Sequence, residues 1–144
     1  MNIRVTKEFN FEMAHALFNY DGPCKNIHGH SYKLAITVKG KPISDTSNIK
    51  QGMVIDFSVI KEIVNKVIIE KYDHALVLNK ADATIFNELR NHKLILTDYQ
   101  PTCENLLMDF VNQVKIEIPK NIHLQYVKLR ETSTAYAEWH SEDN

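Results

Sequence analysis

Two histidines separated by a single glycine, His28 and His30, are the residues of this sequence best placed for chemistry. In an extended strand, residues i and i+2 project from the same face, so both imidazoles point one way if a strand has begun by His28. Gly29 between them keeps the opposite face free of side-chain bulk. Because two imidazoles are too few to hold a catalytic metal, we expect a third ligand from another part of the chain.

His15 is the best candidate for that third ligand. From Ile3 to Met13 every second residue is apolar except Lys7, which is typical of a half-buried strand, and His15 ends the apolar face. The stretch from His28 to Val38 alternates in the same way. If the two strands pair antiparallel, the end of the first lies beside the start of the second. The three imidazoles then converge on one inward-facing patch.

Three neutral imidazoles suit zinc, and three protein ligands leave one coordination position open for water or substrate. Cys24, just before His28, allows a second interpretation, in which a thiolate fills the fourth position and the zinc is structural. A lone histidine on an apolar face is usually a packed core residue, and two histidines around one residue are a weak signal. Three histidines on matching faces, with a cysteine nearby, therefore favour a metal site and leave both kinds of site open.

The composition is that of a single globular domain spanning residues 1–144. A chain of this size buries about 68–70% of its unfolded surface, which is enough for a core. Charge is nearly balanced, with 17 Lys+Arg and 18 Asp+Glu. We see no basic run for nucleic acid and no apolar stretch of membrane-spanning length. Two cysteines make no disulfide framework and the first residues lack a signal-peptide pattern, so we expect a cytoplasmic protein.

Helical periodicity appears twice in the second half of the sequence. Apolar residues between positions 60 and 68 recur at i, i+3, i+4 and i+7, with Asp56 or Ser58 as the cap. A second apolar stripe follows Thr102, the predicted N-cap, and ends before Pro119. Both stripes are typical of helices that pack on a core.

The remaining elements complete an α+β pattern. Residues 76–79 form a short strand or a buried bend, residues 81–90 a short helix, and residues 94–96 a short strand. The stretch from His123 to Trp139 has the pattern of a closing hairpin. The major elements predict a four-stranded antiparallel sheet with two helices on one face, in the order ββααββ. Such a sheet has open edges, which favour assembly.

Three further places carry polar side chains whose role the residues alone leave open. Asp73 beside His74 either fixes the imidazole's tautomer for proton transfer or reflects surface composition, which is the simpler explanation. Glu131 ends an apolar strand face, where a carboxylate needs hydrogen-bond donors such as a ligand, unless it lies just beyond the core in water. Glu104, in the first turn of a helix, complements the helix dipole.

In combination, these residues resemble the 6-pyruvoyl-tetrahydropterin synthases and, more closely, the bacterial 6-carboxy-5,6,7,8-tetrahydropterin synthases of the queuosine pathway. The resemblance runs from Val5 to Trp139. Its marks are His15, Cys24-x-x-x-His28-Gly29-His30, Asp73-His74, Pro101-Thr102-x-Glu104-Asn105 and Glu131-Thr132. The resemblance implies a T-fold, whose trimers close a barrel and stack in pairs as homohexamers with active sites between subunits.

The resemblance also implies a role for each marked residue. The implied zinc ligands are His15, His28 and His30. Cys24 is implied to be a general base rather than a ligand, and Asp73 with His74 a proton-relay pair. The implied substrate-binding residues are Glu131, which anchors the pterin ring, Thr102 and Glu104.

The implied substrate is 7,8-dihydroneopterin triphosphate. The carboxy branch releases triphosphate and acetaldehyde, whereas the pyruvoyl branch releases triphosphate only. The spacing from Cys24 to His28 resembles the bacterial branch, and Cys24 argues against the related folate-precursor group, which carries a glutamate nearby. We therefore expect a zinc-dependent lyase of queuosine biosynthesis. The pyruvoyl enzyme is the alternative, and a noncatalytic zinc-stabilised binding module is the least favoured interpretation.

Overall fold

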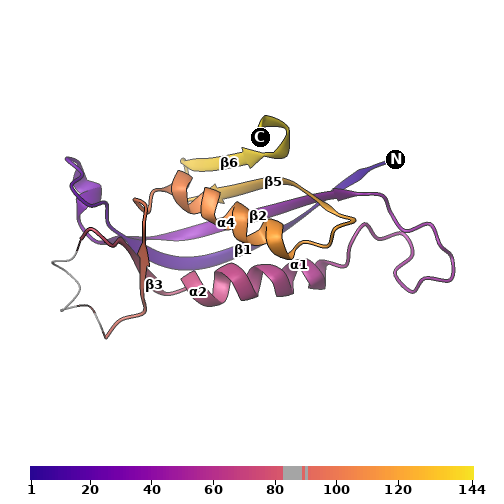
Figure 1. Ribbon diagram of the computed structural model, residues 1–144, viewed down its shortest axis with the longest axis horizontal. Coiled ribbons are helices and arrows are strands. Elements are labelled where there is room, and N and C mark those ends of the chain that lie inside the picture. The colour runs from indigo at the N-terminus through magenta and orange to yellow at the C-terminus, as the bar shows by residue number, and fades with distance from the viewer. Residues whose placement is uncertain (83–88, 90) are drawn as a thin grey trace.

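Two long strands form the centre of the molecule. The structure, a computed structural model, describes residues 1–82, 89 and 91–144. Strand β1 (Ile3–His15) pairs antiparallel with β2 (His28–Gly40) along its whole length, as Figure 1 shows. Buried and exposed residues alternate along both strands, so the predicted half-buried strands are confirmed.

Within the described residues, the sheet has six strands in the order β4-β3-β1-β2-β5-β6. On one side of the central pair, β5 (His123–Arg130) and β6 (Tyr136–His140) form the predicted closing hairpin, with β5 antiparallel to β2. On the other side, β3 (Ala75–Asn79) pairs with β1 and β4 (Leu94–Thr97) pairs with β3, both in parallel. The prediction of a four-stranded, fully antiparallel sheet is therefore wrong.

A long helical segment explains the parallel strands. It begins with α1 (Phe57–Val64), continues through a π-helical turn (Asn65–Ile69) and ends with α2 (Glu70–Tyr72). The segment starts near the end of β2 and returns the chain to the end of the sheet where β1 finishes (Figure 1). The chain therefore enters β3 running in the direction of β1. Asp56 caps the segment by accepting a hydrogen bond from the Ser58 amide, as predicted.

The second helix, α4 (Cys103–Glu117), covers the same face of the sheet. Thr102 is its N-cap and accepts a hydrogen bond from the Asn105 amide. The helix packs against β5, β6 and the π-helical turn. The core between helices and sheet includes the following fully buried side chains: Tyr32, Leu34, Ile36, Ile60, Val64, Ile68, Leu106, Phe110 and Leu129.

The sequence also predicts short elements between residues 76 and 96. The apolar runs at 76–79 and 94–96 are both strands. For residues 76–79 this decides between the strand and the buried bend that the sequence allowed. The helix expected over residues 81–90 lies largely outside the described residues. Among the helices that the structure describes, none is long and apolar enough to cross a membrane.

Removing one buried ring from α4 tests this packing. Phe110 is fully buried and contacts the rings of Phe11 and Tyr72 edge-on. We expect Phe110→Ala to lower the free energy of unfolding by about 3–5 kcal/mol, because it leaves a cavity between sheet and helices. Urea denaturation followed by circular dichroism measures the change.

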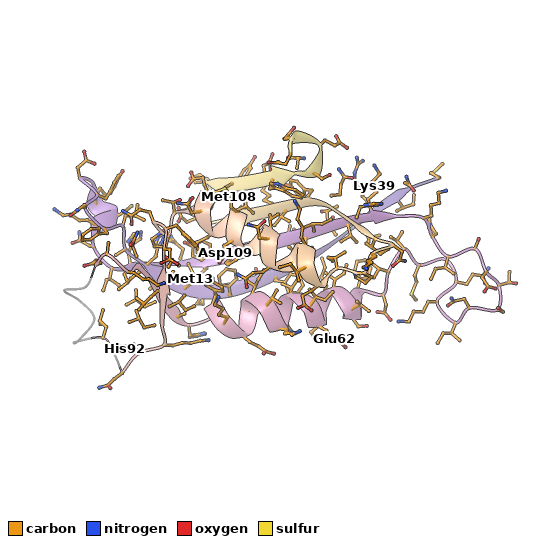
Figure 2. The ribbon with its side chains drawn as sticks, in the orientation of Figure 1. Met13, Lys39, Glu62, His92, Met108 and Asp109 are labelled. Atoms are coloured by element: carbon orange, nitrogen blue, oxygen red, sulfur yellow. The ribbon has the colours of Figure 1, made fainter. Side chains whose placement is uncertain are left out.

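Met108 on the same helix is the matched control. It is 54% exposed, and Figure 2 labels it on α4. Met108→Ala should change the free energy of unfolding by less than about 0.5 kcal/mol. Equal losses for the two variants would contradict the assignment of the buried face of α4.

Candidate metal centre

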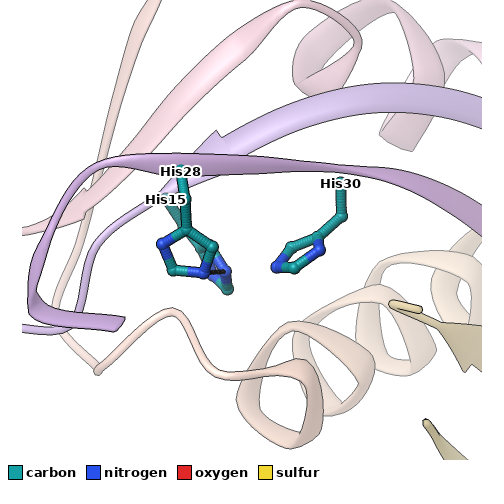
Figure 3. Close-up of side chains that lie close together, drawn as sticks. All are labelled: His15, His28 and His30. Carbon is teal, nitrogen blue, oxygen red and sulfur yellow. Dashed lines mark hydrogen bonds between the residues drawn. The ribbon is translucent and has the colours of Figure 1, made fainter. Parts of the chain in front are cut away.

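Three imidazoles meet at one end of the β1–β2 pair. The strand register sets His15 opposite His28 and Met13 opposite His30. One ligand nitrogen from each ring lies within 4.8 Å of those of the other two rings. His15 is 3% exposed and the other two are half-buried, and Figure 3 shows the three rings gathered on one side of the strands. The predicted convergence of the three histidines is confirmed.

The spacing of these nitrogens fits a shared cation. The Nε2 atoms of His15 and His28 lie 3.2 Å apart. Two ligands of a tetrahedral zinc ion, each bound at 2.0–2.1 Å, are about 3.3–3.4 Å apart. His15 and His28 therefore need little movement to bind one metal ion through Nε2, and a ring nitrogen of His30 lies within 4.8 Å of the ligand nitrogens of both.

Backbone carbonyls orient two of the rings. The Nδ1 atom of His15 lies 2.7 Å from the Pro101 carbonyl oxygen, and that of His28 lies 2.8 Å from the Asn26 carbonyl oxygen. A nitrogen that faces a carbonyl must carry the proton, so each Nε2 keeps its lone pair for a metal. Burial also lowers the pKa of His15, which favours the neutral imidazole that metals bind. The donor set thus fits the metal that the sequence predicts.

Cys24 lies outside this cluster. It belongs to a short 3-10 helix, η1 (Pro23–Lys25), in the loop between β1 and β2, and it is half-buried. Among the described residues, the side chains that could share a metal ion are the three histidines. This arrangement favours the open three-ligand site over the closed site in which Cys24 is the fourth ligand.

Glu131 faces the cluster from the end of β5. Its Oε1 atom lies 3.6 Å from Nε2 of His15 and 3.9 Å from Nε2 of His30, and its side chain is 23% exposed. The hydroxyl of Tyr32 donates a hydrogen bond to the same oxygen at 3.1 Å. Glu131 therefore lies beside the histidines rather than beyond the core in water. The sequence analysis did not assign Tyr32 to the site, although Tyr32 lies on the same face of β2 as His28 and His30.

Asp73 and His74 contact each other beside β1. Oδ2 of Asp73 lies 3.0 Å from Nδ1 of His74, and Oδ1 accepts a hydrogen bond from the Glu12 amide, which lowers the pKa of Asp73. His74 lines a groove of about 530 Å³ together with Ala14 and Ser31. These two strand residues point away from the metal cluster, because their side chains alternate with those of the histidines. The lining of the groove also includes His30, one of the three clustered histidines.

Residues 4–142 match the family model described as 6-pyruvoyl tetrahydropterin synthase. The chain belongs to this family. It is 35% identical over 142 residues to a Haemophilus influenzae protein named 6-carboxy-5,6,7,8-tetrahydropterin synthase, covering 94% of this chain and 97% of that protein.

Solved structures agree on the fold. A Wolinella succinogenes protein described as uncharacterized superposes with a TM-score of 0.75 at 17% identity, over 98% of this chain and 99% of that one. The Caenorhabditis elegans 6-pyruvoyl tetrahydropterin synthase superposes with a TM-score of 0.71 at 20% identity, over 98% and 96% of the two chains. At these identities the likeness establishes the shared fold.

The other marked residues of the 6-pyruvoyl tetrahydropterin synthase family pattern lie at the start of α4. The Thr102 hydroxyl caps the helix, and Glu104 is exposed in its first turn. Cys103 between them is buried, donates a hydrogen bond to the Leu129 carbonyl, and has its pKa raised to about 11 by burial. Pro101, whose carbonyl orients His15, brings this helix start against the metal centre.

Removal of one ligand tests the centre. We expect His28→Ala to weaken zinc binding at least about 100-fold, since loss of an outer-shell partner alone costs 10- to 100-fold. Metal analysis after dialysis against a zinc buffer measures the bound metal per chain. His123→Ala, at the exposed start of β5, is the control and should retain zinc. Zinc content unchanged by His28→Ala would exclude the three-histidine centre.

Proposed function

We propose that the protein is a zinc-dependent 6-carboxy-5,6,7,8-tetrahydropterin synthase of the cytoplasm. It converts 7,8-dihydroneopterin triphosphate and one water molecule to 6-carboxy-5,6,7,8-tetrahydropterin, with loss of triphosphate and acetaldehyde, as a step of queuosine biosynthesis. The observation that carries this proposal is the convergence of His15, His28 and His30 beside the carboxylate of Glu131. The name of the Haemophilus influenzae relative supports the carboxy branch.

The alternative is a 6-pyruvoyl-tetrahydropterin synthase, which releases triphosphate only. This alternative is consistent with the description of the family model and with the name of the Caenorhabditis elegans protein, which both refer to the 6-pyruvoyl enzyme. A noncatalytic zinc module fits the site less well, because structural zinc normally has four protein ligands and this cluster offers three imidazoles.

The residues of the metal centre divide the chemistry among them. His15, His28 and His30 would hold zinc, which would supply a Lewis acid to polarise a substrate oxygen. Glu131 accepts paired hydrogen bonds from the pterin amino group and ring N–H, which fixes the ring in the site. Tyr32 holds the Glu131 carboxylate through its hydroxyl. The side chain of the substrate is thereby directed towards the histidines.

Two groups move protons in this proposal. Cys24, as a thiolate, takes a proton from the side-chain carbon next to the pterin ring. The Asp73 carboxylate holds Nδ1–H of His74, so Nε2 of the same ring is available to exchange a proton with substrate. Thr102 and Glu104, next to Pro101 at the start of α4, line the substrate pocket.

In this proposal the proton relay acts at the metal centre of a second subunit. The side chain of His74 is 77% exposed and lines an open groove, where another subunit could meet it. Assembly through the edges β4 and β6 into trimeric barrels, stacked as a homohexamer, would form each active site between subunits.

Identification of the product distinguishes the two branches. The zinc-loaded protein is incubated with 7,8-dihydroneopterin triphosphate, the pterin is identified by mass spectrometry, and acetaldehyde is assayed enzymatically. The carboxy branch predicts 6-carboxytetrahydropterin and one acetaldehyde per turnover. A 6-pyruvoyl product without acetaldehyde would establish the alternative, and no turnover would exclude both enzymes.

Substitution of the proposed base separates catalysis from metal binding. We expect Cys24→Ala to keep one zinc per chain and to lower kcat by at least about 100-fold, the lower end of general-base contributions. Steady-state kinetics and metal analysis measure the two effects. Cys103→Ala, which removes the other thiol, should keep turnover within a few-fold. Loss of zinc from Cys24→Ala would instead favour the closed structural site.

Mixing two inactive variants tests the shared site. Cys24→Ala and His74→Ala are each expected to be inactive as pure assemblies. If the two are dissociated, mixed in equal amounts and reassembled, about a quarter of the sites regain both wild-type groups. Activity of the mixture compared with an equal amount of wild type measures this recovery. An inactive mixture, shown by mass spectrometry to contain hybrid assemblies, would place both groups in one subunit.

A further inference from the structure

The loop that carries Cys24, residues 16–27, is closed by its own hydrogen bonds; we call it the cysteine loop. The Leu17 amide donates to the Cys24 carbonyl at 2.9 Å, which joins the two sides of the loop. The Asn26 amide donates to the Pro23 carbonyl at 3.1 Å and completes the turn around Cys24. These bonds give the loop a shape but do not attach it to the helical layer of the molecule.

Gln100 makes that attachment. Its Oε1 atom accepts a hydrogen bond from the Phe18 amide at 3.0 Å, and its Nε2 atom donates to the Phe18 carbonyl at 2.5 Å. One side-chain amide thus satisfies both backbone groups of one loop residue, as a neighbouring strand would. Within the part of the chain that the structure describes, these bonds tie the cysteine loop to the connector between β4 and α4.

Three hydrogen bonds hold Gln100 and the residue before it against α4. Its carbonyl accepts hydrogen bonds from the Thr102 amide at 2.8 Å and from Nδ2 of Asn105 at 2.9 Å. The hydroxyl of Tyr99, the preceding residue, donates to the Asp109 carboxylate on α4 at 2.8 Å. Figure 2 labels Asp109 on this helix. The backbone at Gln100 is therefore fixed to the start of α4.

Gln100 is also close in sequence or through its hydrogen bonds to the two segments whose carbonyls orient the histidines. Pro101, directly after Gln100, supplies the carbonyl that orients His15. The cysteine loop contains Asn26, whose carbonyl orients His28. The Gln100 side chain thus binds the loop that contains both Cys24 and Asn26.

We propose that Gln100 is a positioning residue for the reaction, because its amide holds the cysteine loop, and Cys24 with it, in register with the metal centre. This inference rests on the proposed role of Cys24 as the base. A base that is displaced by about 1 Å loses on the order of 100-fold in rate even when substrate binding is retained. The expected signature of the lost tether is therefore a fall in kcat with little change in KM.

Two variants and a control test the tether. Gln100→Ala removes both hydrogen bonds to Phe18. Gln100→Glu keeps the shape of the side chain but has no N–H to donate, so a carboxylate oxygen faces the Phe18 carbonyl oxygen. Gln51→Ala, in an exposed turn, is the control. We measure kcat and KM with 7,8-dihydroneopterin triphosphate, zinc per chain, and hydrogen exchange of peptides from the cysteine loop.

The expected result is a 10- to 100-fold fall in kcat, about the range for a misplaced catalytic group, for both Gln100 variants. KM stays within about three-fold and zinc remains bound, since both zinc and pterin contacts are retained. Exchange in the cysteine loop becomes at least about ten-fold faster, while exchange in β1 and β2 outside the loop is unchanged. Gln51→Ala matches the wild type in every measurement.

Several results would overturn the inference. Wild-type kcat, or wild-type loop exchange, in both Gln100 variants would show that the amide does not position the base. Loss of zinc together with turnover would assign Gln100 to the integrity of the metal centre instead. Absence of turnover by the wild-type protein is a different outcome, because it excludes the proposed function. If Gln100→Ala does not fold, Gln100→Glu carries the same comparison.

Discussion

The antiparallel register of β1 and β2 is the constraint on which the metal centre depends. It sets His15 opposite His28, and a slip of one residue would turn one set of imidazoles to the other face of the sheet. The register is fixed by the core, because Phe11 and Tyr32 stack as opposed residues on the same face as the histidines. The driving force that buries these rings therefore also aligns the ligands.

The orientation of the ligands depends on segments that are distant in sequence. The Pro101 carbonyl lies 86 positions from His15, and it is available because Thr102 begins a helix immediately afterwards. The Asn26 carbonyl comes from the loop that joins the two strands. Strand pairing thus brings the rings together, whereas a helix start and a loop turn select the nitrogen that faces a metal.

Local patterns account for what the sequence predicts correctly. Alternation of side chains follows directly from strand geometry, so the face shared by His28, His30 and Tyr32 follows from their spacing. The caps Asp56 and Thr102 are equally local, because each accepts from an amide two or three residues further on.

Long-range placement accounts for what the sequence leaves out. The run from Ala75 to Leu78 is buried throughout and has no alternation, so its partner and direction depend on where the preceding helix returns the chain. The hydrogen bonds from Gln100 to Phe18 and from Tyr32 to Glu131 span 82 and 99 positions and follow no periodic pattern. The family resemblance implies that Glu131 binds substrate, because of its position in the sequence. It does not predict the hydrogen bond from Tyr32 that holds the Glu131 carboxylate.

The backbone at His74 is held in an uncommon conformation. His74 has a φ of 59°, in the left-handed region, which costs a non-glycine residue about 1 kcal/mol or more. A hydrogen bond of 2.6 Å from its amide to the Glu12 carbonyl holds it in this conformation. Its side chain is 77% exposed over the groove. The strained turn therefore directs the imidazole, paired with Asp73, towards solvent, as the proposed site between subunits requires.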